Sequence, residues 1–260
     1  MKKPLFGKTI VVTRDRHGNT DFAAEIIHRS GNPIEFPTIK IKPLTQTNKF
    51  LHALAKFPGY DWIIFTSPNG VRIFFDYLHS MAKDARVFAS AKIAAIGTQT
   101  AARLTEFGIN PDFVPTVFTG KELGNQLIAR ANMRGKKILL LRSKLASNEL
   151  VDLLQQAGAE VDNAPLYTVV TEKSDNKPLK EKISSGAADW LTFTSPSCVR
   201  AFFEQIPPDL VNSGSVKVAS IGPVTSEQLK NIGVKIDIQA AEHTISGLLD
   251  AIEDNETGKT

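Results

Sequence analysis

The stretch Asp61–Phe75, DWIIFTSPNGVRIFF, decides the fold because the chain carries it twice. Residues Asp189–Phe203 read DWLTFTSPSCVRAFF, and ten of the fifteen positions are identical at an offset of 128. In each copy a short apolar run leads into Ser-Pro, which is typical of an N-cap serine followed by a proline in the first helical position. The stretch therefore predicts a buried strand followed by a helix, in two places.

The repeat extends beyond this stretch in both directions. Gly7–Arg14 aligns with Gly135–Arg142 at the same offset, and Ile93–Ile109 aligns with Val218–Val234 at an offset of 125. Repeats of this length are domain-sized, unlike those of solenoids. Apolar runs without polar alternation, separated by helical segments, indicate parallel strands covered on both faces. We predict an α/β fold that occurs twice, as two similar flavodoxin-like domains with parallel sheets.

The domain boundaries are predicted to lie inside the two copies. The junction between the copies, 133–135, is as short as a loop within one sheet. Segments 36–43 and 164–171 are better linkers, since they are extended and rich in proline or β-branched residues. If both cross between domains, they run in opposite directions and can pair as a two-stranded antiparallel ladder. Each copy then donates its first βα unit to the other copy's sheet. The predicted domains are 1–37 plus 172–260, and 42–165.

Composition and absent motifs exclude several classes of protein. Of the 260 residues, 42% are hydrophobic and 22% are charged, and the net charge is +4, which describes a mildly basic globular protein. The sequence has no block of five Lys or Arg, no apolar run of about 18 residues, and no Gly-x-Gly or His-Glu-x-x-His motif. We therefore expect no nucleic acid, no membrane, no metal and no cofactor.

Cys198 is the single cysteine, so a disulfide within the chain is impossible and a cytoplasmic location is favoured. The first residues also contain no apolar stretch long enough for a signal peptide. Because the repeat partner of Cys198 is Gly70, we interpret it as a small helix residue in preference to a nucleophile. The five histidines lack ligand spacing and are interpreted as surface or helix residues.

Polar residues follow the predicted strands, at the edge where open α/β sheets bind ligands. The helix N-termini there offer unpaired N–H groups and partial positive charge, which suit carboxylates or phosphates. Capping alone is the competing explanation for the hydroxyl residues, and solvation is the competing explanation for the arginines. The candidate substrate-binding residues are Arg14, Thr66, Ser67, Gly97, Thr100, Arg142, Thr194, Ser195, Ser197, Gly222, Thr225 and Thr244.

Tyr167 lies on the second linker, where its phenol can reach a ligand as a hydrogen-bond donor. Packing within the linker is the alternative explanation for this tyrosine.

The sequence resembles the uroporphyrinogen-III synthase family over about Lys8 to Ile252. The resemblance rests on the order and spacing of Phe193–Ser197, Ile221–Thr225, Pro165–Tyr167 and Thr244–Leu248. It implies two α/β domains joined by a two-stranded ladder, with the substrate in the cleft. It also implies a cofactor-free, monomeric enzyme, and it leaves open a transient contact with hydroxymethylbilane synthase, the preceding enzyme.

The reaction implied by the resemblance is a lyase reaction, the closure of hydroxymethylbilane to uroporphyrinogen III with inversion of ring D. Ring A loses its hydroxyl to give an azafulvene, which joins the substituted α-carbon of ring D as a spirocyclic pyrrolenine before rearranging. Since the substrate also closes unaided to the unrearranged isomer, conformational control is the main task. Tyr167 matches the functional tyrosine of the family and is expected to act as general acid. Thr100 and Thr225 match its cleft threonines.

Two other functions share these sequence features. A bilobed binding protein for a polyanionic small molecule would have the same linkers and helix N-termini, although such receptors are usually exported. A nucleotide-sugar transferase would normally show a carboxylate pair for a metal, or a glycine-rich loop. Supplying hydroxymethylbilane and identifying the product isomer distinguishes the three.

Overall fold

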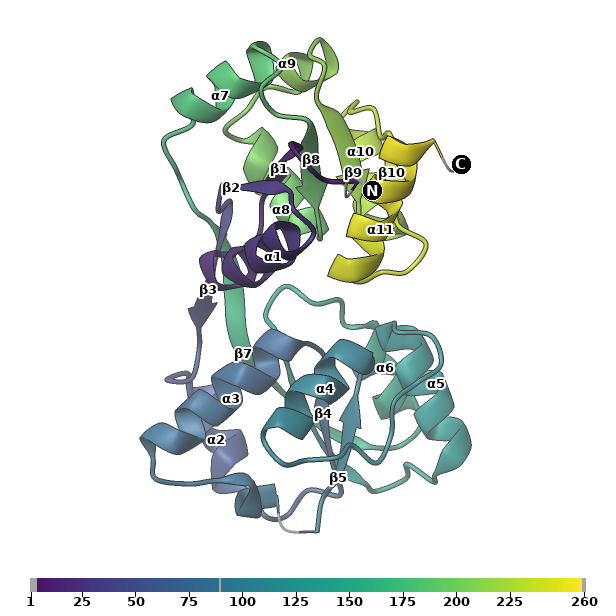
Figure 1. Ribbon diagram of the computed structural model, residues 1–260. Helices are drawn as coiled ribbons and strands as arrows, with labels where there is room; N and C mark the ends of the chain where they lie inside the picture. Colours follow the sequence, from purple (N-terminus) through teal and green to yellow (C-terminus); the bar gives the residue numbers. More distant parts are fainter. Residues whose placement is uncertain (1–3, 89, 259–260) are drawn as a thin grey trace. The chain divides into compact units, whose positions relative to one another are not determined.

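The computed structural model describes residues 4–88 and 90–258, and its contacts divide the chain into two compact units (Figure 1). Unit 1 comprises Met1–Lys40 and Val170–Thr260, and unit 2 comprises Ile41–Val169. Each unit contains a five-stranded sheet. Strands and helices alternate along the chain, and the predicted mixed α/β fold with parallel sheets is confirmed.

The sheet of unit 1 is assembled from both copies of the repeat, in the order β10-β9-β8-β1-β2, with parallel pairing throughout. Ile10 pairs with Trp190 in the register of β1 and β8, although 180 residues separate them. The strands are β1 (Thr9–Val12), β2 (Asn32–Glu35), β8 (Trp190–Phe193), β9 (Lys217–Ser220) and β10 (Ile238–Gln239).

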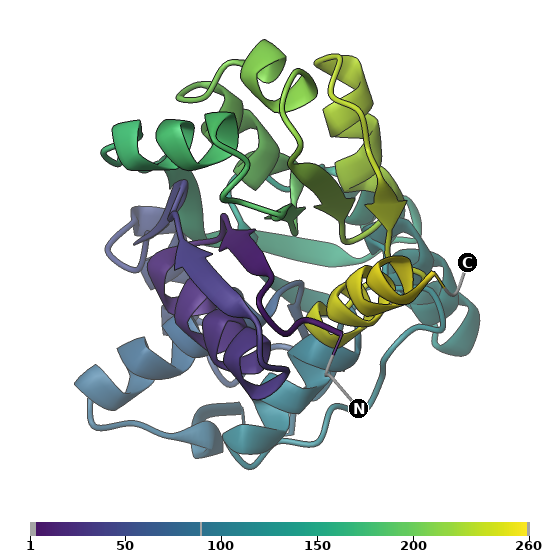
Figure 2. The ribbon, with the colours of Figure 1, turned by 45° about the horizontal axis from the view of Figure 1, so that its top comes forward.

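Helices cover both faces of the unit 1 sheet (Figure 2). One face is covered by α1 (Arg16–His28) and α11 (Ile245–Thr257), whose apolar residues pack against Ile10, Val12 and Trp190. The other face carries the remaining helices, shown in green. They are α7 (Lys177–Ser184), α8 (Pro196–Phe203), α9 (Pro208–Asn212) and α10 (Pro223–Asn231). This double cover explains why the strands are apolar without alternation.

The sheet of unit 2 has the order β3-β7-β6-β4-β5, in which β7, β6, β4 and β5 are parallel. In the segment after α4, Phe113 forms an isolated parallel bridge with Ala94 of β5. The strands are β3 (Ile39–Pro43), β4 (Trp62–Phe65), β5 (Lys92–Ala95), β6 (Lys137–Ser143) and β7 (Glu160–Thr171).

The pleat of β4 sends successive side chains into two separate cores. Ile63 and Phe65 face α2 (Asn48–Ala55), α3 (Pro68–Ser80), α4 (Thr98–Glu106) and the short 3-10 helix Ala85–Phe88. Trp62 and Ile64 face α5 (Gly120–Arg130) and α6 (Glu149–Gln156). Unit 2 is therefore also a sheet between two helical layers.

The two segments in which the chain changes unit lie beside each other, as β3 and β7 of one sheet. Leu44 N–H donates to the Leu166 carbonyl at 2.7 Å, and Glu172 N–H donates to the Thr38 carbonyl at 2.7 Å. The later residue of one segment pairs with the earlier residue of the other, so the two segments run antiparallel.

The repeat is also visible in the backbone. Ser30 (φ 70°) and Gly158 (φ 87°), 128 residues apart, both adopt the left-handed conformation just after the helix that follows the first strand. Gly108 and Gly233, 125 residues apart, do the same after α4 and α10. Both offsets found in the sequence therefore describe structural equivalence.

Candidate functional site

The predicted site residues gather at one edge of each sheet, because the carboxyl ends of parallel strands lie together. In unit 2 this edge, here called edge 2, consists of residues 66–69 after β4, 97–100 after β5, 118–119 before α5, and 142–148 at the end of β6. Tyr167 of β7 belongs to it as well, since it pairs with Ser143 in the register of β6 and β7.

The corresponding edge of unit 1, here called edge 1, consists of residues 13–17, 194–197, 222–225 and 243–244, which follow β1, β8, β9 and β10. The structure thus sorts the predicted residues into two sets. Edge 2 holds Thr66, Ser67, Gly97, Thr100, Arg142 and Tyr167, and edge 1 holds Arg14, Thr194, Ser195, Ser197, Gly222, Thr225 and Thr244.

Tyr167 forms a hydroxyl pair with Ser67 at edge 2. The two side-chain oxygens are 2.8 Å apart, and either can be the donor. Ser67 Oγ also accepts the Gly70 N–H at 3.0 Å, so the serine caps α3 as predicted. Tyr167 is 6% exposed and contributes to the core under α3 and α4. A phenol hydroxyl can both donate and accept, so Tyr167 can take either part in this pair.

Arg142 is buried, with 3% of its surface exposed, so the competing explanation of a solvated charge is wrong for this residue. Its Nη2 donates to the Ala146 carbonyl and, at 3.3 Å, to Asn148 Oδ1, within the loop that follows β6. Its Nε is buried without a hydrogen-bond partner among the described residues. Burial lowers the pKa of Arg142, against the opposing attraction of Asp152.

The cation of Arg142 also makes no ion pair with any carboxylate of residues 4–88 and 90–258. A buried guanidinium without a counter-ion is costly to a fold, because desolvation of the charge is not compensated. Its unused donor at edge 2 therefore fits an anionic ligand better than a structural role.

Arg14, the repeat equivalent of Arg142, is only half-buried. Its backbone N–H donates to Asn19 Oδ1 at 2.7 Å, and the Asn19 Nδ2 is a second buried donor without a partner in the described part of the chain. The side chain lies over Gly18, where an added Cβ would come within 2.9 Å of Arg14 Nε. Gly18 thus leaves room for Arg14 at edge 1.

Cys198 sits beneath the same edge and is 1% exposed. Burial raises the pKa of its thiol, against the opposing effects of the Ser195 hydrogen bond and the Arg14 charge. A protonated, inaccessible thiol is a poor nucleophile. This supports the interpretation of Cys198 as a small helix residue.

Capping accounts for part of the hydroxyl pattern. Ser195 Oγ accepts the Cys198 N–H at 3.3 Å, and Thr244 Oγ1 accepts the Gly247 N–H at 3.0 Å. In contrast, Gly97 and Gly222 cap α4 and α10 without any side chain. The first N–H groups of α4, the helix that carries Thr100, therefore have no side-chain cap to accept from them. In α10 the first residue is Pro223, which has no N–H, and the Thr225 N–H donates to the Gly222 carbonyl at 3.1 Å, so Val224 supplies the uncapped N–H of this helix.

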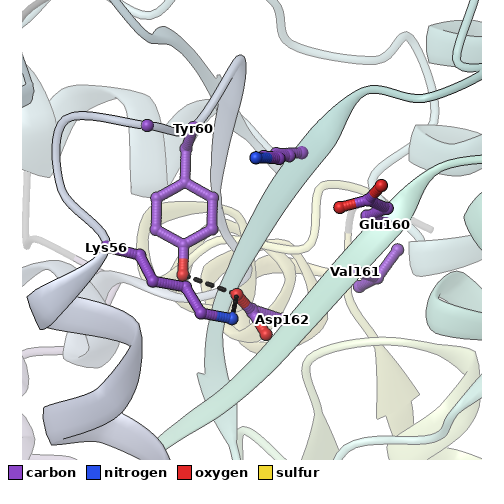
Figure 3. Close-up of a pocket in the computed structure, with 7 residues that line it drawn as sticks. Lys56, Tyr60, Glu160, Val161 and Asp162 are labelled. Atoms are coloured by element: carbon purple, nitrogen blue, oxygen red, sulfur yellow. Dashed lines mark hydrogen bonds and ion pairs between the residues drawn. The ribbon is translucent and has the colours of Figure 1, made fainter.

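A cavity of about 470 Å³ lies at the opposite edge of the unit 2 sheet, near the start of β6 and β7 (Figure 3). Tyr60 Oη and Lys56 Nζ both donate to Asp162 Oδ2 there, at 2.7 Å and 2.8 Å. Because these polar groups are bonded to one another, the cavity offers a ligand little. We interpret the cluster as structural.

Replacing Asp162 with asparagine is expected to lower the free energy of unfolding by about 1 kcal/mol at neutral pH, a modest loss because the side chain is 35% exposed. Burial raises the pKa of Asp162, but the hydrogen bonds from Lys56 and Tyr60 together hold it below its ordinary value. The carboxylate thus stabilises the fold above pH about 4, and this stabilisation is lost as the pH falls further. Denaturant unfolding should show the difference from wild type shrinking in acid, with turnover unchanged; reduced turnover would place the cavity in the active site.

The described residues contain no group of three or more His, Cys, Asp or Glu arranged to hold a metal ion. Among them there is also no helix long and apolar enough to cross a membrane.

Two rings at these edges are missing from the predicted set. Phe118 of edge 2 is 52% exposed, and its ring packs on Gly97. His243 of edge 1 is exposed, and its ring packs on Gly222. Phe118 and His243 are 125 residues apart, which is one of the two repeat offsets, so the sequence could have shown that they are equivalent. A phenylalanine aligned with a histidine does not by itself indicate a binding residue.

Comparison with known proteins identifies relatives along nearly the whole chain. Residues 20–250 match the family model described as uroporphyrinogen-III synthase HemD. A porphyrin biosynthesis protein HemD of Ruminiclostridium josui is 34% identical over 252 residues, covering 97% of this chain and 49% of that protein. A uroporphyrinogen-III synthase of Chlorobaculum parvum is 31% identical over 233 residues, covering 89% and 92% of the two chains. The chain thus spans about half of the first relative and most of the second.

Solved structures share the fold. A crystal structure of a mutant uroporphyrinogen III synthase of Thermus thermophilus superposes with a TM-score of 0.66 at 22% identity, covering 97% of this chain and all of that one. A uroporphyrinogen-III synthetase of Helicobacter pylori gives a TM-score of 0.59 at 17% identity, covering 94% and 96%.

Proposed function

The chain belongs to the uroporphyrinogen-III synthase family, and on that premise we propose that it closes hydroxymethylbilane to uroporphyrinogen III with inversion of ring D. The chain is accordingly an enzyme of tetrapyrrole biosynthesis, in the lyase class. One observation of the structure supports this best. At edge 2 a proton donor, Tyr167, lies on the strand beside the one that carries Arg142, a buried cation whose Nε has no hydrogen-bond partner in the described part of the chain.

Tyr167 is the general acid of this proposal. Its phenol gives a proton to the hydroxyl of ring A, the C–O bond breaks, and water leaves as the pyrrole nitrogen electrons form the azafulvene. Ring D bonds through its substituted α-carbon to give the spirocyclic pyrrolenine, which fragments and recombines at the free α-carbon. That carbon then loses a proton, which balances the one supplied by the phenol. An ordinary phenol is protonated at neutral pH and needs no tuning to donate.

The carboxylates of the substrate bind to the positive groups of the two edges. Arg142 and Arg14 supply guanidinium donors, and the uncapped starts of α4 and α10 supply backbone N–H groups. The remaining members of the proposed binding set hold the substrate through hydroxyl groups or close backbone approach. They are Thr66, Ser67, Thr100, Thr194, Ser195, Ser197, Thr225 and Thr244, with Gly97 and Gly222.

The two units are flavodoxin-like domains in this proposal, with linkers at 36–43 and 164–171. The strand order of unit 1, β2-β1-β8-β9-β10, corresponds to the flavodoxin order 2-1-3-4-5. Unit 2 follows the same order from β7 through β6, β4 and β5 to the bridge at Phe113. Both sheets combine strands from both copies, which supports an exchanged first βα unit and domains at 1–37 plus 172–260 and at 42–165.

Fragments test the exchange. Residues 42–165 are expected to unfold cooperatively as an isolated fragment, because they keep β4, β5, β6 and the first half of β7 together with both helical layers. Residues 1–134 should not, because β1 lacks β8 and β4 lacks β6. Circular dichroism during thermal unfolding is the measurement, and a cooperative transition for 1–134 alone would refute the boundary.

The protein is proposed to act as a cytoplasmic monomer. The lone, buried thiol of Cys198 suits a reducing compartment. Because the free substrate closes spontaneously to the wrong isomer, a transient contact with hydroxymethylbilane synthase would shorten its exposure to solvent.

The test of the proposed function is to supply hydroxymethylbilane and identify the product isomer. Rapid formation of the type III isomer is the expected result. Binding of the bilane without any acceleration of closure would favour the binding-protein alternative.

A further inference from the structure

The rings of Phe118 and His243 occupy equivalent places in the two units. Each lies one residue before the N-cap threonine of the last helix of its repeat, Thr119 or Thr244. The Phe118 ring packs on Gly97, and the His243 ring packs on Gly222, at the same offset of 125. The same contact between a ring and a glycine therefore occurs in both repeats.

Gly97 and Gly222 are needed because they have no side chain, which leaves space for the two rings. Their φ angles of −173° and 172° are extended, so their backbone conformation is open to any residue. A Cβ at Gly97 would lie 2.9 Å from the ring of Phe118, and one at Gly222 would lie 3.0 Å from the ring of His243. Each ring is thus held against the start of a helix, α4 or α10, by the absence of a side chain there.

The rings nevertheless remain accessible. Phe118 is 52% exposed and His243 is exposed, although both are held in a defined place. Two further apolar side chains are also exposed: Leu145 of edge 2 at 59%, and Val117, which directly precedes Phe118, at 53%. Apolar surface held open at a ligand-binding edge is typical of a contact site.

The substrate needs such contacts. Hydroxymethylbilane combines carboxylate side chains with four flat pyrrole rings, and the binding set proposed above consists of polar residues and glycines. Binding sites usually hold the apolar body of a ligand with aromatic and aliphatic side chains, and use polar groups to orient it. Phe118 and His243 supply such aromatic contacts at edge 2 and edge 1.

We propose that Phe118 and His243 each offer a ring face to a pyrrole ring of the substrate and thereby help to fix the conformation that closes to the type III isomer. The inference rests on the proposed function. Offset-stacked or edge-to-face aromatic contacts suit an electron-rich pyrrole, and either an imidazole or a phenyl ring can make them. The nitrogen atoms of His243 are not required for this role.

Steady-state kinetics with hydroxymethylbilane tests the proposal. Phe118→Ala and His243→Ala are each expected to raise KM about two- to tenfold and to increase the fraction of unrearranged isomer. His243→Phe should stay within about twofold of wild type, because it keeps a ring. Phe6→Ala, which removes an aromatic ring that is 63% exposed on the segment before β1, is the matched control and should be silent.

The glycine gives an independent readout. Gly222→Ala should displace the ring and raise KM as His243→Ala does. The double variant should be no worse than either single one, because the new methyl group fits once the ring is gone. Unchanged melting temperatures would show that the fold is intact.

Three results would overturn the proposal: silent alanine variants of both rings, an effect of Phe6→Ala as large as theirs, or a His243→Phe variant as poor as His243→Ala. Each can be observed only with a wild-type protein that forms the type III isomer. Absence of that product would instead count against the proposed function itself.

Discussion

Replacing Tyr167 with phenylalanine is expected to lower kcat about 10- to 100-fold, which is at or below the lower limit of the usual contribution of a general acid, about 100-fold. The substitution removes one oxygen, and with it the 2.8 Å contact to Ser67, but it keeps the ring in the core under α3 and α4. Complete loss is not expected, because the hydroxyl of ring A is a labile leaving group. The fraction of unrearranged isomer should rise as the rate falls, since spontaneous closure then competes. Timed product analysis measures both quantities.

Ser67→Ala is the companion variant, and because Ser67 belongs to the proposed binding set its expected effect on activity is on KM, with kcat retained. It also removes the contact to Tyr167 and the cap of α3, so it should reduce stability by about 1 kcal/mol while leaving the phenol to donate. Thr225→Ala should reduce activity less than Tyr167→Phe, and mainly through substrate binding. Wild-type turnover and isomer ratio in Tyr167→Phe would mean that the tyrosine only packs. Control of the reaction would then pass to the backbone amides at the helix starts.

Replacing Arg142 with methionine is expected to lower kcat/KM about 100-fold, which corresponds to about 3 kcal/mol for a buried charged hydrogen bond to a carboxylate. The free energy of unfolding should change by no more than about 1 kcal/mol. The variant loses the bonds to Ala146 and Asn148, but it also removes a buried cation that has no ion pair with the described carboxylates. Enzyme assays and denaturant unfolding of the same preparation separate the two effects.

Arg14→Met is the companion variant, because Arg14 is the repeat equivalent of Arg142 but is half-buried. A smaller loss of kcat/KM is expected, since a partly solvated charge contributes less to binding. If Arg142→Met unfolds easily and keeps its kcat/KM, the arginine serves the loop 143–148 and does not bind substrate.

Much of the fold was predictable because the sequence contains an internal repeat, and the two copies can be compared with each other. The copies of Asp61–Phe75 and Asp189–Phe203 fix two strands and two capped helices, and the structure places β4 and β8 at Trp62–Phe65 and Trp190–Phe193. Serine capping followed from the local motif alone, because Ser67 and Ser195 bond to residues only three positions away. Short-range chemistry of this kind leaves a clear trace in sequence.

Features that depend on distant or irregular packing were not predictable. The burial of Arg142 is produced by the loop at 144–148, which folds back so that its carbonyl and amide oxygens reach the guanidinium. Phe113 forms only one bridge, although its sequence context resembles that of a strand. The contact of His243 with Gly222 joins residues 21 positions apart through space, and no local motif encodes it.

The site was predicted as a set of strand ends, and the structure places those residues at one edge of each unit. Their individual roles stay predictions, because hydrogen bonds such as that of Thr244 with Gly247 serve a helix whether or not a ligand is present. Buried donors of Arg142 and Asn19 that have no partner among the described residues favour ligand binding over capping, and they became visible only in three dimensions.

The pairing of β1 with β8 determines the order in which the two units can fold during translation. A ribosome that has made Ile10 must add 180 further residues before Trp190, its partner, exists. At about 5 to 20 residues per second, β1 and β2 wait about 10 to 40 s with exposed edges while unit 2 is completed first. Nascent chains should therefore acquire protease resistance from the middle outward. Strands β1 and β2, although synthesised before unit 2, should be bound by chaperones until β8 emerges.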